Sequence, residues 1–179
     1  QKKLVRKYDT LTAAEKRYAA LTGQKPAFDD VPATHWAYDA VCYVALQELM
    51  IGNSQGQFQP DSAMNRAMTW TVLSRVAGKS LSTSADPWYG AARAWTQETQ
   101  LSDGTAPLNE VTREQMVVML CRYAEQAGLS VEHTGDLSAY SDGAAVSDWA
   151  KDAMSWAVGC GLIQGANGKL MPQKALSRA

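Results

Sequence analysis

The 179-residue sequence is poor in the residues that bind metal ions or form disulfide frameworks. It contains three cysteines, Cys42, Cys121 and Cys160, and two histidines, His35 and His133. No two cysteines have a Cys-x-x-Cys spacing, whereas a structural zinc site usually closes with four Cys or His ligands at short spacing. We therefore expect no metal site and no cofactor, and we expect the cysteines to be small buried apolar residues.

An excess of charge of one sign and long apolar runs are also missing. The 17 Lys and Arg residues are balanced by 18 Asp and Glu residues, for a net charge of −1. Such a chain has no overall positive field for nucleic acid or an anionic membrane. No apolar run approaches the roughly 20 residues of a membrane-spanning helix. We expect neither a nucleic-acid partner nor a membrane span, so any anion must be bound by local arginines.

The sequence does contain a short phrase that occurs three times. Each copy, called here an arginine phrase, joins an apolar residue, a residue that caps helix N-termini and an arginine. The copies are Met64-Asn65-Arg66, Val111-Thr112-Arg113 and Leu176-Ser177-Arg178. Asn, Thr and Ser side chains accept hydrogen bonds from first-turn N–H groups, so each copy predicts a helix start. In the middle copy, Gln115 follows Thr112 at the spacing of a capping box.

The arginine is the unusual member of the phrase. A cation beside the positive end of a helix dipole is unfavourable, by roughly 0.3–1 kcal/mol when exposed. An external carboxylate or phosphate would reverse that sign, because helix N–H groups and the guanidinium would bind it together. The alternative is that the arginine only covers apolar surface with its stem. Recurrence in Arg66, Arg113 and Arg178 favours the anion.

The arginine phrases belong to a longer repeat. A turn glycine follows a tryptophan by 16 residues in three places, at Trp36–Gly52, Trp88–Gly104 and Trp149–Gly165, and the arginine follows the tryptophan by 30, 25 and 29 residues. Apolar residues after the first and third tryptophans recur at i, i+3, i+4, i+7 and i+8, which predicts an amphipathic helix. They are Ala37, Ala40, Val41, Val44 and Ala45, then Ala150, Ala153, Met154, Ala157 and Val158.

This spacing predicts an all-α chain of three tandem helix-loop-helix repeats that share one core. We place an N-terminal helix and linker at residues 1–27 and the repeats at 28–79, 80–129 and 130–179. The first helix of repeat one should end at residues 49–52, with Gly52 as a left-handed C-cap. Repeat two lacks the aromatic-x-Asp opening, so a site that depends on it should be weaker. Repeat three lacks its second helix, and the helix expected at residues 12–21 is a candidate to fill that place.

The first repeat resembles the S-layer homology repeat. The resemblance rests on five elements in order, Phe28-x-Asp30-Val31-Pro32, His35-Trp36-Ala37, Gly52, Gly56-x-Phe58-x-Pro60-Asp61 and Asn65-Arg66-Ala67-Met68. The last element is usually Thr-Arg-Ala-Glu in that family. The match covers residues 28–179, is strong in repeats one and three, and is partial in repeat two.

The resemblance implies a non-catalytic, extracellular module of bacterial cell-surface proteins, with repeats in a pseudo-threefold arrangement around a central helical bundle. Grooves between repeats would bind an acidic secondary cell-wall polysaccharide, commonly one bearing a pyruvate ketal, which is a carboxylate on a sugar. Other copies of the same surface protein are further candidate partners. The implied ligand-binding residues are Arg66, Arg113, Arg178, Asp30, Asp142, Trp36, Trp149, Gly52 and Gly165.

Two other functions stay open at this point. The module could be a structural lattice or protein-docking piece whose arginines only cap helices, and the tryptophans could pack in the core. A glycosidase would need two carboxylates at a defined separation. The candidates Asp29, Asp30, Asp142 and Asp148 lie near helix starts, where capping explains them. We therefore expect no enzyme.

Overall fold

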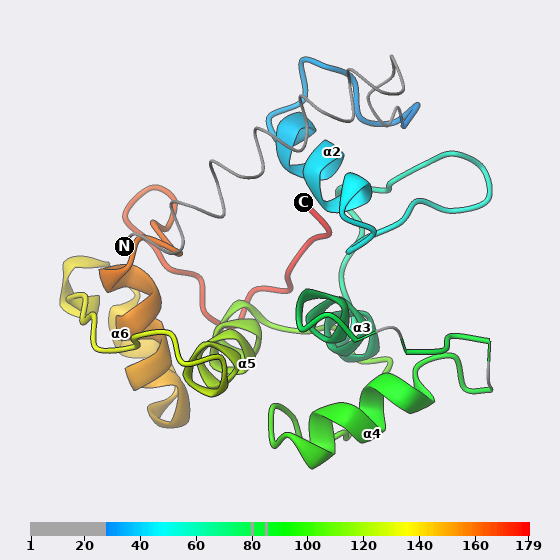
Figure 1. Ribbon diagram of the computed structural model, residues 1–179. Helices are drawn as coiled ribbons and strands as arrows, with labels where there is room; N and C mark the ends of the chain where they lie inside the picture. Colours follow the sequence, from blue (N-terminus) through cyan, green and yellow to red (C-terminus); the bar gives the residue numbers. More distant parts are fainter. Residues whose placement is uncertain (1–27, 80, 85) are drawn as a thin grey trace. The chain divides into compact units, whose positions relative to one another are not determined.

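A computed structural model describes residues 28–79, 81–84 and 86–179 of the chain (Figure 1). The helix expected at residues 12–21, and its suggested place in the bundle, lie outside this part. The described residues divide into two compact units, residues 28–62 with 177–179 and the described part of 63–176. Each unit is described by itself.

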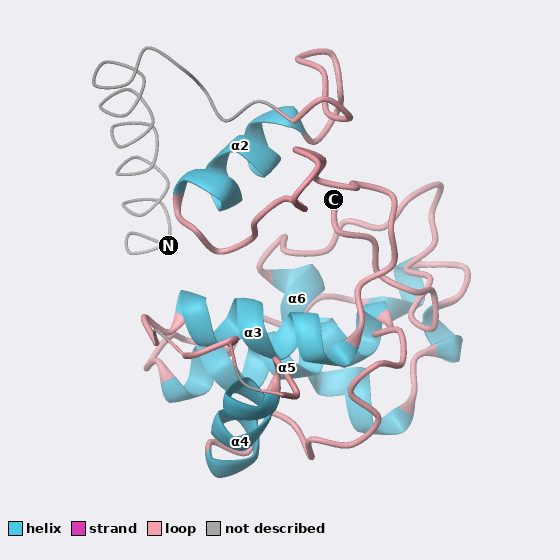
Figure 2. Cartoon of the chain, turned by 90° about the vertical axis from the view of Figure 1, so that its right-hand side faces the viewer, coloured by secondary structure: helices cyan, strands magenta, loops and turns pink. Residues whose placement is uncertain are grey.

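The described chain is helical. Its α-helices are α2 (Tyr38–Leu46), α3 (Arg66–Val76), α4 (Gly90–Glu98), α5 (Arg113–Gln126) and α6 (Lys151–Gly159), with short 3-10 turns η1 (Leu137–Ala139), η2 (Gly143–Ala145) and η3 (Asp148–Ala150). Figure 2 shows helices joined by loops, and residues 28–79, 81–84 and 86–179 contain no strand. The all-α prediction is confirmed. Within the same residues, no helix combines the length and apolarity needed to cross a membrane.

The second helices begin where the arginine phrases predict. Helix α3 starts after Asn65, whose Oδ1 accepts the N–H of Met68 at 2.8 Å. Helix α5 starts after Thr112, and Thr112 and Gln115 form the expected capping box. Both helices end two residues before a left-handed glycine, Gly78 (φ 72°) and Gly128 (φ 67°), as the C-cap preference of glycine requires.

The first helix of repeat one is shorter than predicted. Helix α2 ends at Leu46, and the left-handed residue after it is Glu48 (φ 54°). Gly52 is not left-handed, so its prediction as a C-cap was wrong. Gly52 is instead required by a close approach, because a Cβ there would lie 2.4 Å from the Phe28 ring. Helix α4 likewise ends at Glu98, before the left-handed Gln100 (φ 57°).

The predicted apolar faces are largely buried. In α6 and the residue before it, Ala150, Ala153, Met154 and Ala157 pack with Val117 and Val118 of α5 in the core of the second unit, and Figure 1 shows α5 beside α6. In the first unit Ala37 and Val41 are buried but Ala40 is exposed. The prediction of buried cysteines holds for Cys42 and fails for Cys160, which is exposed, and none of the three cysteines forms a disulfide within the described residues.

The apolar residues that open the three arginine phrases bind one another through their main chains. Met64 N–H donates to Leu176 C=O at 2.8 Å, Leu176 N–H to Val111 C=O at 2.9 Å, and Val111 N–H to Met64 C=O at 2.9 Å. These three hydrogen bonds form a closed cycle in the second unit. Such a cycle is compatible with a pseudo-threefold arrangement of the repeats, which stays a prediction.

A buried carboxylate ties α5 to the third repeat. Glu114, in the first turn of α5, is almost fully buried. Its oxygens accept the N–H and Oγ–H of Ser147 at 3.1 and 2.8 Å, and the amide of Gln173 at 3.3 Å. Ser147 precedes η3, which leads into α6, so this carboxylate fixes how α6 packs against α5.

We predict that Glu114→Ala lowers the free energy of unfolding by about 1–3 kcal/mol, because the donors of Ser147 lose their buried acceptor. Chemical denaturation at neutral pH measures the change. Glu125→Ala, at an exposed position of the same helix, is the control and should change stability by less than about 0.5 kcal/mol. Equal losses in the two variants would contradict this role of Glu114.

Candidate functional site

Each repeat carries a turn that ends in proline. The three proline turns are Phe58-Gln59-Pro60, Thr105-Ala106-Pro107 and Leu170-Met171-Pro172, and their middle residues are left-handed with φ of 59°, 45° and 53°. The first residue of each turn precedes the arginine of its own repeat by eight residues. The three turns are therefore equivalent, although only the first and third have an apolar first residue.

Each arginine of the three phrases docks on the proline turn of another repeat. Arg66 Nε donates to Thr105 C=O at 2.9 Å, and Arg113 Nε donates to Leu170 C=O at 2.9 Å, both within the second unit. Arg178 Nε donates to Phe58 C=O at 2.8 Å within the first unit. The sequence predicted these three arginines as equivalent, and their equivalent contacts are with carbonyl groups of the protein.

The main-chain N–H groups beside these arginines bind the proline of each turn and the residue two positions after it. In the first pair, Arg66 N–H donates to Asn109 C=O at 3.0 Å and Ala67 N–H to Pro107 C=O at 2.8 Å. The other two phrases repeat both bonds, Arg113 and Glu114 with Lys174 and Pro172, and Arg178 and Ala179 with Ser62 and Pro60. The prediction that these N–H groups would receive an external anion was therefore wrong.

Aspartates from the opening motifs hold two of the turns. Asp30 accepts the N–H groups of Phe58 and Gln59 at 2.8 and 2.6 Å, and Asp142 accepts those of Leu170 and Met171 at 2.7 and 2.8 Å. Partial burial of Asp30 opposes these donors, but together with nearby Arg178 they hold the pKa of Asp30 below its usual range. Both carboxylates are committed to positioning the carbonyl that an arginine binds.

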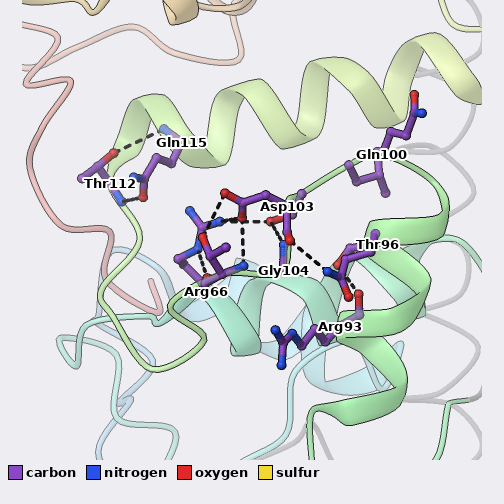
Figure 3. Close-up of polar contacts among 12 residues, drawn as sticks. Arg66, Arg93, Thr96, Gln100, Asp103, Gly104, Thr112 and Gln115 are labelled. Carbon is purple, nitrogen blue, oxygen red and sulfur yellow. Dashed lines mark hydrogen bonds and ion pairs between the residues drawn. The ribbon is translucent and has the colours of Figure 1, made fainter.

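Repeat two lacks that opening motif, and an aspartate inside its loop holds the proline turn instead. Asp103 Oδ1 accepts the Thr105 N–H at 2.9 Å, and Oδ2 accepts the Thr105 hydroxyl. The same carboxylate pairs with Arg66 Nη2 at 2.5 Å (Figure 3). The Thr105 N–H, which outweighs partial desolvation, together with the Thr105 hydroxyl and Arg66, holds the pKa of Asp103 below its usual range.

The three guanidinium groups therefore differ in charge balance. Arg66 is paired with Asp103, whereas in the described part of the chain neither Arg113 nor Arg178 has a carboxylate within ion-pair distance. Arg178 Nη2 donates to Ile51 C=O at 3.0 Å, and the group lies 4.7 Å from the Phe58 ring centre. Burial lowers the pKa of Arg178, while Asp30 acts in the opposite direction. Of the three arginines, Arg113 and Arg178 therefore keep N–H donors that the contacts described here do not use.

The tryptophans of the three repeats are on the surface. Trp36 is 79% exposed, Trp149 58% and Trp88 36%, so the alternative that they pack in the core was wrong. Of the predicted glycines, Gly165 has φ 69° and a Cβ there would lie 2.5 Å from Lys169 C=O. Gly52 and Gly165 thus have steric roles, and a ligand-binding role for either stays a prediction.

Sequence reasoning missed Asp103 as a site residue. The signal was present, because Asp103 directly precedes the turn glycine Gly104, and the invariant 16-residue spacing aligns it with Ile51 and Gln164. Repeat two lacks the opening aspartate, so an acid at this position could have been predicted to replace it. What the sequence could not show is that the same carboxylate also reaches Arg66.

We predict that Asp30→Ala lowers the thermal midpoint of unfolding at pH 7, because the buried Phe58 N–H loses its acceptor. The folded pKa of Asp30 is depressed, so its contribution is present above about pH 3.9, the unfolded value, and is lost as pH falls through the folded pKa. Thermal unfolding from pH 7 to pH 2 should show the gap to wild type closing below that value. Asp29→Ala, at the exposed neighbouring position, is the control and should leave the midpoint nearly unchanged; an equal drop would contradict the bracing role of Asp30.

Comparison with known sequences gives consistent results. The sequence model of the S-layer homology domain matches residues 27–67 and 139–179, in the first and third repeats. The chain is 24% identical over 85% of its length to the S-layer protein sap of Bacillus anthracis, and 30% identical over 80% to the surface-layer 125 kDa protein of Lysinibacillus sphaericus. It is 24% identical over 91% of its length to an amylopullulanase of Thermoanaerobacterium thermosulfurigenes.

These alignments cover only 20%, 13% and 9% of the respective relatives. The chain therefore corresponds to one segment of much longer proteins. The first and third repeats are therefore S-layer homology domain repeats, and the chain is similar to S-layer proteins over most of its length.

Proposed function

We propose that this chain is a non-catalytic module that anchors a protein to the bacterial cell wall by binding an acidic polysaccharide. The observation that carries the proposal is that Arg113 and Arg178 occupy equivalent, half-buried positions on proline turns and lack a carboxylate partner among the described residues. A guanidinium has five N–H donors. The protein contacts described above use one donor of Arg113 and two of Arg178.

A pyruvylated wall polysaccharide fits these features. Its carboxylate would accept charge-assisted hydrogen bonds from the remaining donors of Arg113 and Arg178. The exposed rings of Trp36 and Trp149 offer apolar faces for the C–H surfaces of sugar rings. Asp30 and Asp142 would act by holding the proline turns in place. Arg66, paired with Asp103, would contribute least, as expected for a site that depends on the divergent repeat two.

The names of the relatives support an accessory role. The same chain aligns with S-layer proteins and with an amylopullulanase, over a small fraction of each. A segment shared by proteins of such different names is better explained by a common location than by a common reaction. The names of these relatives thus support a location outside the cell, at the wall of a bacterium.

A second candidate is a structural or protein-docking module without glycan binding. It is favoured by the internal hydrogen bonds of all three arginines and by the exposed apolar side chains of Leu108 and Leu162. On this reading the arginines hold the proline turns, and the apolar side chains meet other copies of the same surface protein.

Binding to purified cell-wall sacculi tests the proposal. We expect Arg113→Ala combined with Arg178→Ala to weaken binding by at least about a hundredfold, because each arginine loses at least one charged hydrogen bond and two such losses cost about 3 kcal/mol or more. Arg93→Ala, an exposed arginine of α4, is the control and should bind like wild type. Sacculi stripped of their acidic polymer should bind neither wild type nor the Arg93→Ala variant.

Thermal unfolding of each variant separates binding from folding. If the double variant stays folded and still sediments with intact sacculi at wild-type affinity, the glycan-binding proposal is wrong and the structural module is favoured. The same conclusion follows if removal of the acidic polymer has no effect on wild-type binding.

A further inference from the structure

The residue directly before the turn glycine differs in chemistry among the three repeats. It is Ile51 in repeat one, Asp103 in repeat two and Gln164 in repeat three, each 15 residues after the tryptophan. All three residues are exposed. One position thus carries an apolar side chain, a carboxylate and a neutral amide in otherwise equivalent loops.

This position lies beside the arginine that docks on the same loop. In the first unit, Arg178 Nη2 donates to the main-chain oxygen of Ile51 at 3.0 Å. In the second unit, Arg66 Nη2 reaches the side chain of Asp103 at 2.5 Å, and Figure 3 shows the two groups meeting. In the loop on which Arg113 docks, Gln164 holds the equivalent sequence position.

We propose that the residue before the turn glycine decides which arginines can bind an external carboxylate. Asp103 keeps Arg66 closed, that is, unavailable to such a ligand, because it supplies an internal carboxylate. The inference rests on the proposed function and refines it. Arg178, beside Ile51, and Arg113, in the loop of Gln164, are the open positions.

The surroundings of Arg66 support a closed position. Its side chain is only 14% exposed, and its donors bind Thr105 C=O, Ser102 Oγ and Asp103 Oδ1. Asp103 is itself held by the Thr105 N–H and hydroxyl, so the carboxylate is fixed in place before any ligand arrives. An external carboxylate would have to displace a tethered group, whose effective concentration is on the order of millimolar or higher.

The open positions have no such competitor. Ile51, whose main-chain oxygen accepts a hydrogen bond from Arg178, has a 61% exposed apolar side chain. An apolar residue at this position suits a ligand whose carboxylate is attached to a small alkyl group. Gln164 is neutral and adds no negative charge to the loop on which Arg113 docks. The aspartates of these two loops, Asp30 and Asp142, are engaged with main-chain N–H groups.

Reciprocal exchange of the residue tests the proposal. Asp103→Asn removes the charge and keeps an oxygen for the Thr105 N–H, so the turn should persist. Gln164→Asp introduces a carboxylate in the loop of Arg113. The probe is sodium pyruvate, and the readout is the chemical shift of each arginine Nε–H group in the full chain, with sodium chloride at equal ionic strength as control.

We expect pyruvate to shift the wild-type signals of Arg113 and Arg178 and to leave that of Arg66 unchanged. Asp103→Asn should give Arg66 a response at least about tenfold stronger, and Gln164→Asp should weaken that of Arg113 by a similar factor, which corresponds to one charged hydrogen bond. Thermal unfolding checks that both variants remain folded.

The proposal is overturned if Arg66 responds as strongly as Arg113 in wild type, or if neither substitution changes the response of its arginine. It is also overturned if no arginine responds to pyruvate while wild type still binds sacculi, in which case the anchoring function survives through other groups. Absence of sacculus binding with the arginine responses as expected would overturn the anchoring function alone.

Discussion

The structure depends on the hydrogen bonds that each arginine phrase donates to the proline turn of another repeat. The first N–H groups of a helix have no partner inside the helix. Here the N–H groups of Arg66 and Ala67 at the start of α3, and those of Arg113 and Glu114 at the start of α5, donate to the proline of that turn and to the residue two positions after it. The arginine side chain adds a third bond to the turn itself. A helix start in one repeat is therefore completed by a loop of a different repeat, so no single repeat contains all the groups that it needs.

This constraint also explains the unusual cation at the helix start. The macrodipole disfavours an arginine there, but the side chain leaves the helix axis and binds the carbonyl of a braced turn. The carboxylate that holds the proline turn comes from one of two places in this chain. Repeats one and three use an aspartate that lies about 28 residues earlier in sequence, and repeat two uses Asp103 in the loop itself. The aspartate in the loop neutralises Arg66, so similar folding contacts lead to different charges at the surface.

The parts of the fold that the sequence predicted are those with local chemical signals. Asn65 and Thr112 mark the starts of α3 and α5 through their own side chains, and Gly78 and Gly128 mark the ends. The ends of α2 and α4 could not be predicted, because the left-handed residues there are Glu48 and Gln100, which give no local sign of that conformation. The equivalence of the three arginines followed from the repeat spacing, but their partners depend on contacts 36 to 127 residues apart, which no single-sequence pattern fixes.

The constancy of these contacts confines variation in length to one short stretch. Sixteen residues separate tryptophan from turn glycine, and eight separate the first residue of the proline turn from its arginine, in all three repeats. The differences fall between the glycine and the turn, where the steps are six, one and five residues. At the tip of the longest such loop, Gly56 has open space around it. An insertion at this tip, whether it arises by evolution or by design, therefore leaves both fixed spacings unchanged. A foreign epitope grafted there would be displayed at the surface while the register of the scaffold is preserved.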